Sequence, residues 1–154
     1  MLDSVMMSEL PGLLPYLTLQ QRQELDKLIL TAPNRLPSAT ALMEQSGRTP
    51  DPWQHLFLSS TALRTLLLCS RQSGKSMCSA VLALHTALSL AGSLILLLSP
   101  SLRQSAELFR KVLDLYGAVE TGVDRRDDNS LKMELANGSR IVSLPGKEGT
   151  VRGY

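Results

Sequence analysis

The sequence is poor in aromatic residues and in net charge. Phe, Trp and Tyr make up 4% of its 154 residues, so a folded core must consist mainly of Leu, Val, Ile and Ala. The formal net charge is +2, which argues against binding to nucleic acid through bulk charge alone but allows a local basic groove. The length allows one domain with a core large enough to fold.

Cysteines and long apolar runs are also scarce. Cys69 and Cys78 are too few for a disulfide scaffold and lack the spacing of a zinc site, so we expect two reduced thiols in a cytosolic protein. Residues 1–7 lack the basic start of a secretory signal, and the longest apolar run, residues 94–98, is too short to span a bilayer. These features predict a soluble, cytoplasmic protein without membrane contact.

The N-terminal part, residues 1–50, is predicted to be a helical leader and a connector. Thr18 and Gln21 have the spacing of a capping box, and an apolar stripe at helical spacing follows them. Residues 33–52 are rich in Pro, Ser, Thr and Asn, with one short possible helix over residues 39–45. The leader helix is interpreted as a packing element without chemistry.

From residue 51 the hydrophobic pattern alternates between strands and helices. Residues 65–68 and 93–98 are apolar runs that predict buried strands, the first of them buried on both faces. Helices are expected over residues 75–90 and 102–116, the second opened by a capping box. Strand, helix, strand and helix in this order predict an α/β domain with a parallel sheet and right-handed crossovers.

A hairpin is predicted after a polar stretch at residues 121–130. Apolar and polar residues alternate over 131–135, and residues 140–144 form the returning strand. Asn137-Gly138 between them is the favoured two-residue turn, in which both positions have a positive φ.

Residues 69–76, Cys-Ser-Arg-Gln-Ser-Gly-Lys-Ser, form the motif with the clearest chemistry. They match the phosphate-binding pattern G-x-x-x-x-G-K-[ST], except that Cys69 replaces the first glycine. An apolar run precedes the motif and a helix follows it, and the amides and dipole at a helix N-terminus attract phosphate. The sequence therefore predicts nucleotide binding by a P-loop NTPase fold, and the alternative is a plain turn that caps a helix.

Each residue of this loop has an expected role toward ATP. Gly74 lets the backbone approach the phosphates, Lys75 reaches the β- and γ-phosphate oxygens, and the hydroxyl of Ser76 joins the Mg²⁺ shell. Arg71 either stabilises charge that develops in the transition state, or it is a solvated loop arginine or part of a salt bridge. The other expected contacts to the nucleotide come from Ser70, Gln72 and Ser73.

With an arginine before Gly-Lys-Ser and no first glycine, the loop resembles the deviant phosphate loop of phage terminase large subunits, the ATPases that package viral DNA. Asp51-Pro52-Trp53-Gln54 resembles the adenine-contacting Gln motif of that family. The resemblance implies that Gln54 pairs with the adenine edge and that Trp53 stacks near the nucleotide. The alternatives are a helix cap for Gln54 and a packing contact for Trp53.

Three further segments are similar to terminases. Residues 99–106 resemble a segment that lies near DNA in related translocases, although Arg103 there is also compatible with a solvated helix position. Residues 137–141 and 151–154 resemble the stretch that leads into the acidic strand, and by analogy Arg152 acts in trans on the nucleotide of a neighbouring subunit.

The resemblance covers residues 15–154 and implies a RecA-like sheet with flanking helices that uses ATP and Mg²⁺. The implied partners are double-stranded DNA, a terminase small subunit, a portal protein and further copies of the chain in a ring. The implied location is the cytoplasm of the host cell. The alternatives are a fragment of another P-loop translocase, such as a helicase, and a small nucleotide-binding adaptor.

An ATPase of this class also needs an Asp and a Glu at the end of another apolar strand. Asp114 falls in a predicted helix and Asp127-Asp128 in a polar stretch, so no acidic pair is placed correctly. Residues 51–154 are therefore interpreted as the N-terminal part of an ATPase domain, without its acidic strand and nuclease domain. We expect the isolated chain to bind ATP weakly or not at all and to have negligible turnover.

Overall fold

The chain forms two compact units, Met1–Arg35 and Leu36–Tyr154. The computed structural model describes residues 18, 20–21, 37–129 and 131–146. In the first unit the capping box is confirmed, because Thr18 N donates to Gln21 Oε1 at 3.0 Å and Gln21 N donates to Thr18 Oγ1 at 3.3 Å. The rest of the predicted leader helix lies outside the described residues.

The short helix predicted in the connector is confirmed as α3, Ala39–Gln45. The hydroxyl of Ser38 caps it by accepting from Ala41 N at 3.1 Å. α3 packs against helix α5 of the second unit and buries Leu42 and Met43 there. The second compact unit begins at Leu36 and includes α3.

Three further helices follow α3. α4, Pro52–Leu58, begins with proline at its first position and packs on α3 and α5. α5, Lys75–Ser89, and α6, Leu102–Ala118, confirm the two predicted long helices. Ser101 caps α6 by accepting from Gln104 N at 3.3 Å.

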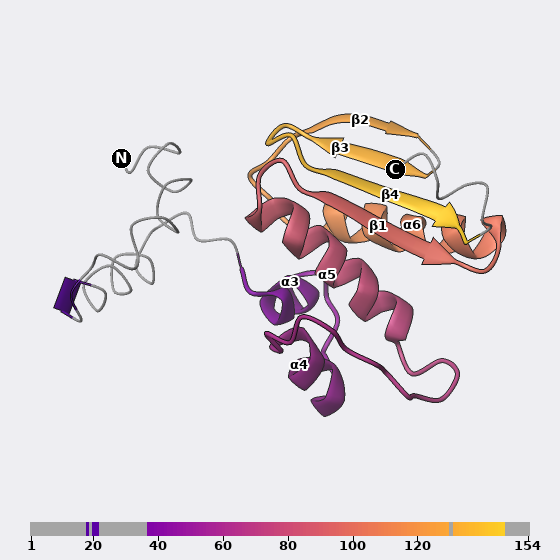
Figure 1. Ribbon diagram of the computed structural model, residues 1–154, viewed down its shortest axis with the longest axis horizontal. Coiled ribbons are helices and arrows are strands. Elements are labelled where there is room, and N and C mark those ends of the chain that lie inside the picture. The colour runs from indigo at the N-terminus through magenta and orange to yellow at the C-terminus, as the bar shows by residue number, and fades with distance from the viewer. Residues whose placement is uncertain (1–17, 19, 22–36, 130, 147–154) are drawn as a thin grey trace. The chain divides into compact units, whose positions relative to one another are not determined.

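The sheet is mixed and has the strand order β1-β4-β3-β2. β1, Leu94–Ser99, runs parallel to β4, Arg140–Pro145, while β3, Lys132–Leu135, is antiparallel to both β4 and β2. α6 packs on β1 and β4, and α5 packs on α6 and β1, so both helices cover the same face (Figure 1). The domain is therefore mixed α/β, with one parallel strand pair, β1–β4, and two antiparallel pairs, β4–β3 and β3–β2.

The polar stretch at residues 121–130 contains a strand that was not predicted from the sequence. β2, Arg125–Asn129, pairs with β3 at the edge of the sheet. Its charged sequence has no apolar alternation, so only pairing with β3 makes it a strand. Charged side chains on an edge strand also discourage pairing with other chains.

The strand predicted at residues 65–68 is wrong. This segment is irregular, and the side chains of Leu66 and Leu68 are 95% and 100% exposed. An apolar run predicts burial, but a strand also needs a neighbour for its backbone groups, and no described strand pairs with this run. In the structure the segment 69–76 is therefore preceded by coil.

β1 was predicted to be a buried strand, but one of its faces is open. Leu97 on the helix-covered face is buried, whereas Leu94, Leu96 and Leu98 on the other face are 43%, 37% and 53% exposed. The composition of the strand contains no signal for this difference, because leucine occupies both faces.

The predicted β3–β4 hairpin is confirmed, but its turn differs from the expected one. Among the two central residues only Gly138 has a positive φ, at 82°. Leu135 O accepts from Gly138 N at 2.9 Å, and Leu135 N donates to Ser139 O at 2.9 Å. The loop is thus one turn followed by a left-handed glycine, which the longer hairpin connections favour.

Candidate phosphate-binding site

The backbone of the Gly-Lys-Ser segment forms the start of α5. Gly74 is the N-cap residue with φ 88°, and Gln72 before it has φ 61°. The backbone N–H groups of Gly74, Lys75 and Ser76 have no hydrogen-bond partner in the described part of the chain. Unpaired amides in a row at a helix N-terminus are the elementary form of an anion site.

Lys75 lies folded onto the loop that precedes it. Its Nζ donates to Cys69 O at 3.0 Å, to Ser70 O, and to Ser73 Oγ at 3.2 Å. The hydroxyl of Ser73 in turn donates to Ser70 O at 3.0 Å. A phosphate group at the amides of α5 would offer the ammonium charged oxygens in place of neutral carbonyls, and such hydrogen bonds are stronger.

Gln54 joins α4 to this loop. Its side chain is buried, with Oε1 accepting from Asp51 N at 2.9 Å and Nε2 donating to Ser73 O at 3.2 Å. A Cβ atom at Gly74 would lie 2.3 Å from Nε2, so the amide packs directly on the glycine. Gln54 therefore caps α4 and supports the loop, and its pairing with adenine stays a prediction.

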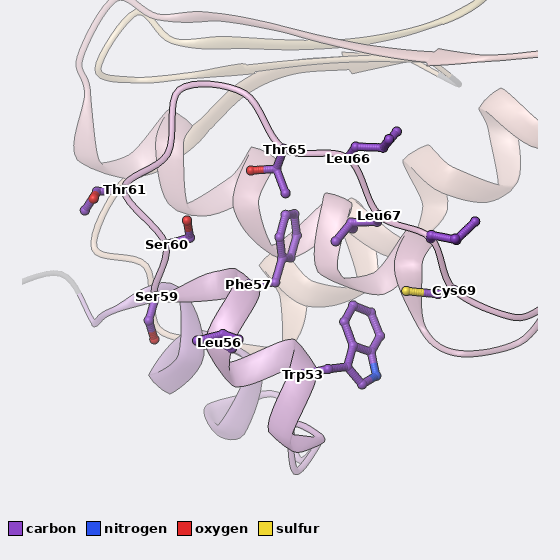
Figure 2. Close-up of a pocket in the computed structure, with 11 residues that line it drawn as sticks. Trp53, Leu56, Phe57, Ser59, Ser60, Thr61, Thr65, Leu66, Leu67 and Cys69 are labelled. Carbon is purple, nitrogen blue, oxygen red and sulfur yellow. The ribbon is translucent and has the colours of Figure 1, made fainter.

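Trp53 lines an apolar pocket of about 620 Å³. The pocket lies between α4 and residues 59–69, and Figure 2 shows Trp53 beside Cys69 and the ring of Phe57 beside Leu67. Because Cys69 begins the segment 69–76, the indole lies next to the start of that segment.

The other predicted loop residues are open to solvent. Ser70, Arg71, Gln72 and Ser76 have exposed side chains. The Arg71 guanidinium makes no hydrogen bond or ion pair with the residues that the structure describes, so the salt-bridge alternative is not seen there. Its role toward a nucleotide stays a prediction. Arg152 lies outside the described residues.

A polar crevice of about 260 Å³ opens beside Ser76, where β1 ends and α6 begins. It is lined by side chains from three elements, namely Ser76, Ser99, Pro100, Gln104, Glu107, Leu108 and Lys111. The carboxyl ends of parallel strands are the usual location of ligand sites in α/β sheets. Glu107 thus brings a carboxylate close to the Gly-Lys-Ser segment. A search for acidic residues at strand ends does not find this residue, because it lies within helix α6.

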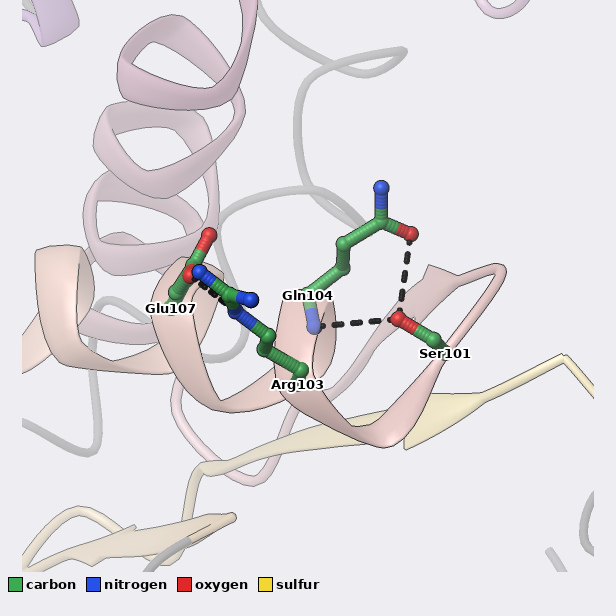
Figure 3. Close-up of polar contacts among 4 residues, drawn as sticks. All are labelled: Ser101, Arg103, Gln104 and Glu107. Atoms are coloured by element: carbon green, nitrogen blue, oxygen red, sulfur yellow. Dashed lines mark hydrogen bonds and ion pairs between the residues drawn. The ribbon is translucent and has the colours of Figure 1, made fainter.

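The first turns of α6 hold the segment that resembles a DNA-proximal region. The Arg103 side chain is 88% exposed, and its Nε lies 3.1 Å from Glu107 Oε1 (Figure 3). Figure 3 also shows Gln104 beside Ser101, the cap of the helix. The exposed arginine fits the solvated position, and contact with DNA stays a prediction.

The thiols and imidazoles contribute no further site. Both cysteines are free, as predicted, and burial raises the pKa of the Cys78 thiol. Burial also lowers the pKa of His85, which lies within α5, while His55 is exposed. Within the described ranges no group of three or more His, Cys, Asp or Glu side chains is arranged to hold a metal ion.

No protein-family model and no curated protein matches the sequence. None of the described helices combines the length and the apolar composition needed to cross a membrane. The chain is thus characterised by a mixed α/β fold in which a Gly-Lys-Ser turn opens a core helix.

Proposed function

We propose that residues 70–76 bind the phosphate groups of ATP together with Mg²⁺. The observation that carries the proposal is the row of unpaired amides at Gly74, Lys75 and Ser76, set by the left-handed N-cap glycine. These amides and the ammonium of Lys75 supply positive potential on one short stretch of backbone, and a triphosphate is the common biological ligand with matching charge.

The side chains of the loop then have separate tasks. Lys75 exchanges its contacts with the carbonyls of Cys69 and Ser70 for phosphate oxygens. Ser76 presents its hydroxyl at the open end of the loop, where Mg²⁺ would neutralise phosphate charge. Arg71 is free to turn toward the terminal phosphate, because it makes no ion pair with another described residue.

Mg²⁺ fits the residues that are present near Ser76. In nucleotide sites this ion keeps several waters and is held by one or two carboxylates besides the phosphates. The crevice beside Ser76 contains one carboxylate, that of Glu107. A full set of protein ligands is therefore not required.

The base would lie on the α4 side of the loop. Trp53 lines an apolar pocket next to Cys69, and Gln54 contacts the loop at Ser73 O. An aromatic ring at the wall of an apolar pocket is suited to stacking on a purine. The Gln54 amide retains one N–H and one lone pair after its two contacts in the protein, but the side chain is buried and would have to turn outward to reach the adenine edge.

At the level of the whole protein, we propose that this chain provides the ATP-binding part of a viral terminase large subunit. Support comes from the resemblance of residues 51–54 and 69–76 and from the position of both segments around one loop. Such a motor acts on double-stranded DNA with a small subunit, a portal protein and a ring of like chains in the host cytoplasm. A chain that binds nucleotide but no duplex DNA in fluorescence anisotropy would instead favour an adaptor.

Nucleotide binding can be tested even if it is weak. A ¹⁵N-labelled chain titrated with Mg·ATP should show shifts of the Gly74, Lys75 and Ser76 amide signals that saturate in the millimolar range. Lys75→Ala should abolish these shifts. Arg110→Ala removes one exposed positive charge from α6 and should leave them unchanged. Shifts that are absent from the loop, or equal in both variants, would refute the proposal.

Turnover provides a second test. We expect the isolated chain to release no phosphate above background, since the described residues bring only one carboxylate to the crevice beside the loop. Sustained phosphate release in a malachite-green assay, lost in Lys75→Ala, would contradict this expectation.

A further inference from the structure

The crevice beside Ser76 is lined by residues of both charges as well as by neutral polar residues. Its polar lining includes a carboxylate, an ammonium, an amide and two hydroxyls, from Glu107, Lys111, Gln104, Ser76 and Ser99. Gln104, Glu107 and Lys111 are spaced three and four residues apart and so lie on one face of α6. This face is turned toward the first turn of α5, which carries Ser76.

We propose that this crevice is the subsite for the terminal phosphate of the bound triphosphate and its Mg²⁺. Glu107 faces the metal together with Ser76, and Lys111 faces the phosphate. The inference rests on the proposed function, because it extends the same site from the loop onto α6. It gives Glu107, on helix α6, a role in metal binding that no motif in the sequence indicates.

The continuity of the site supports this assignment. Ser76 belongs both to the row of unpaired amides and to the lining of the crevice, so a chain of phosphates that begins on the loop leads into it. The crevice is large enough for a phosphate group and several waters. A hydrated Mg²⁺ that keeps most of its waters needs that space.

The charges that line the crevice suit a metal–phosphate pair better than either ion alone. Lys111 would repel a bare cation, and Glu107 would repel a bare phosphate. With both ions present, each side chain has an oppositely charged neighbour. The crevice should therefore bind Mg²⁺ only when the nucleotide is present.

The ion pair between Arg103 and Glu107 does not block the site. The two side chains are 88% and 49% exposed, and exposed pairs of this i,i+4 type contribute little to stability. Glu107 can therefore leave Arg103 for a doubly charged ion at little cost. Arg103→Gln removes the same ion pair but keeps the carboxylate, which makes it the matched control for Glu107→Gln.

The test uses Mn²⁺ as a paramagnetic substitute for Mg²⁺ in the full chain with a non-hydrolysable ATP analogue. We expect the amide signals of Ser76, Gln104, Glu107 and Lys111 to broaden when metal and nucleotide are both present, and to stay sharp with metal alone. Glu107→Gln should remove most of the broadening on α6. It should also weaken the gain in nucleotide affinity caused by Mg²⁺ by about tenfold.

Two controls separate the possible outcomes. Arg103→Gln and Glu120→Gln, which changes an exposed acidic residue beyond α6, should both keep the wild-type response to metal. If loop shifts persist but α6 stays sharp, or if Glu107→Gln responds like wild type, the crevice is not the metal subsite while nucleotide binding stands. If nucleotide causes no loop shifts in the wild-type chain, the proposed function fails and this inference fails with it.

Discussion

At the residue scale, the contact between Gln54 and Gly74 connects two segments that are separated in sequence. A Cβ atom at residue 74 would lie 2.3 Å from Nε2, so the buried amide would have to shift and lose its present contacts. The same glycine needs its φ of 88° to begin α5. Two independent constraints thus require glycine at this position.

Gly74→Ala should therefore destabilise the protein more than Gly47→Ala does. Both glycines have a positive φ, which costs an alanine roughly 1–2 kcal/mol. Only Gly74 adds a clash, for which we expect about a further 1–3 kcal/mol, while no atom lies within 4 Å of a Cβ at Gly47. Urea unfolding measures the difference, and the Gln54→Ala background should reduce it. Equal losses in both variants would refute the contact.

The two thiols should differ in reactivity. Cys78 is fully buried and burial raises its pKa, so it has little thiolate at pH 8, whereas Cys69 is only half-buried. Titration of the folded chain with a thiol reagent should modify Cys69 quickly and Cys78 only after unfolding. Cys69→Ser should remove the fast phase, and rapid labelling of that variant would contradict the buried position of Cys78.

His85 makes stability depend on pH. Burial lowers its pKa in the folded state below the ordinary value of 6.5, so the unfolded state binds more protons in this range. The contribution of neutral His85 is complete above pH 6.5 and is lost as the pH falls from 6.5 toward the lowered pKa. The free energy of unfolding should drop less between pH 7.5 and 5.5 in His85→Gln than in wild type. An identical drop in both proteins would exclude this role.

At the element scale, the tip of the β3–β4 hairpin caps the end of α5. Asn137 Nδ2 donates to Ala87 O at 2.8 Å, and Ser139 Oγ donates to Leu90 O at 2.8 Å. The last carbonyls of a helix have no partner within it, so these contacts satisfy groups that otherwise need water. Asn137 therefore serves the packing of the hairpin on α5 rather than a left-handed turn position.

Asn137→Ala should cost about 1–3 kcal/mol, because it removes the contact to Ala87 O and the one in which Ser139 N donates to Asn137 Oδ1 at 3.0 Å. Urea unfolding at neutral pH measures the loss. Gln45→Ala, a change at an exposed position of α3, should alter stability by less than about 0.5 kcal/mol. A loss at Asn137 no larger than that at Gln45 would show that the cap contributes nothing.

At the scale of the whole molecule, the apolar run at residues 65–68 and the apolar core differ in their exposure to solvent. The core consists of residues from α3, α4, α5, α6 and three strands, including Leu84 and Phe109. Leu66 and Leu68 are 95% and 100% exposed and have no part in it. The run that led to the prediction of a supporting strand is thus an exposed apolar segment in this fold.

Replacement of both Leu66 and Leu68 by serine should change the free energy of unfolding by less than about 0.5 kcal/mol. Leu84→Ala, which empties a fully buried position, should cost about 2–5 kcal/mol. Thermal and urea unfolding of the three proteins measure both values. A loss of several kcal/mol from the double serine variant would show that residues 65–68 form a buried strand after all.

Local signals in the sequence predicted helices α3, α5 and α6 and the β3–β4 hairpin, but not helix α4. Ser101 and Gln104 predicted the start of α6, the apolar periodicity predicted α5, and the Gly-Lys-Ser triplet predicted a loop that opens this helix. These features depend on residues within one or two turns of each other, so a single sequence contains enough information for them. The triplet also located the candidate phosphate site at Lys75 and Ser76.

Only the tertiary structure decided which segments acquire neighbours. β2 is a strand because it pairs with β3. Residues 65–68 do not form a strand, because no described strand lies beside them. Gln54 reaches Ser73, and Glu107 reaches the crevice at Ser76, through packing of helices that are distant along the chain. Strand pairing and convergence of side chains are non-local, and their energies depend on partners that no local pattern of residues specifies.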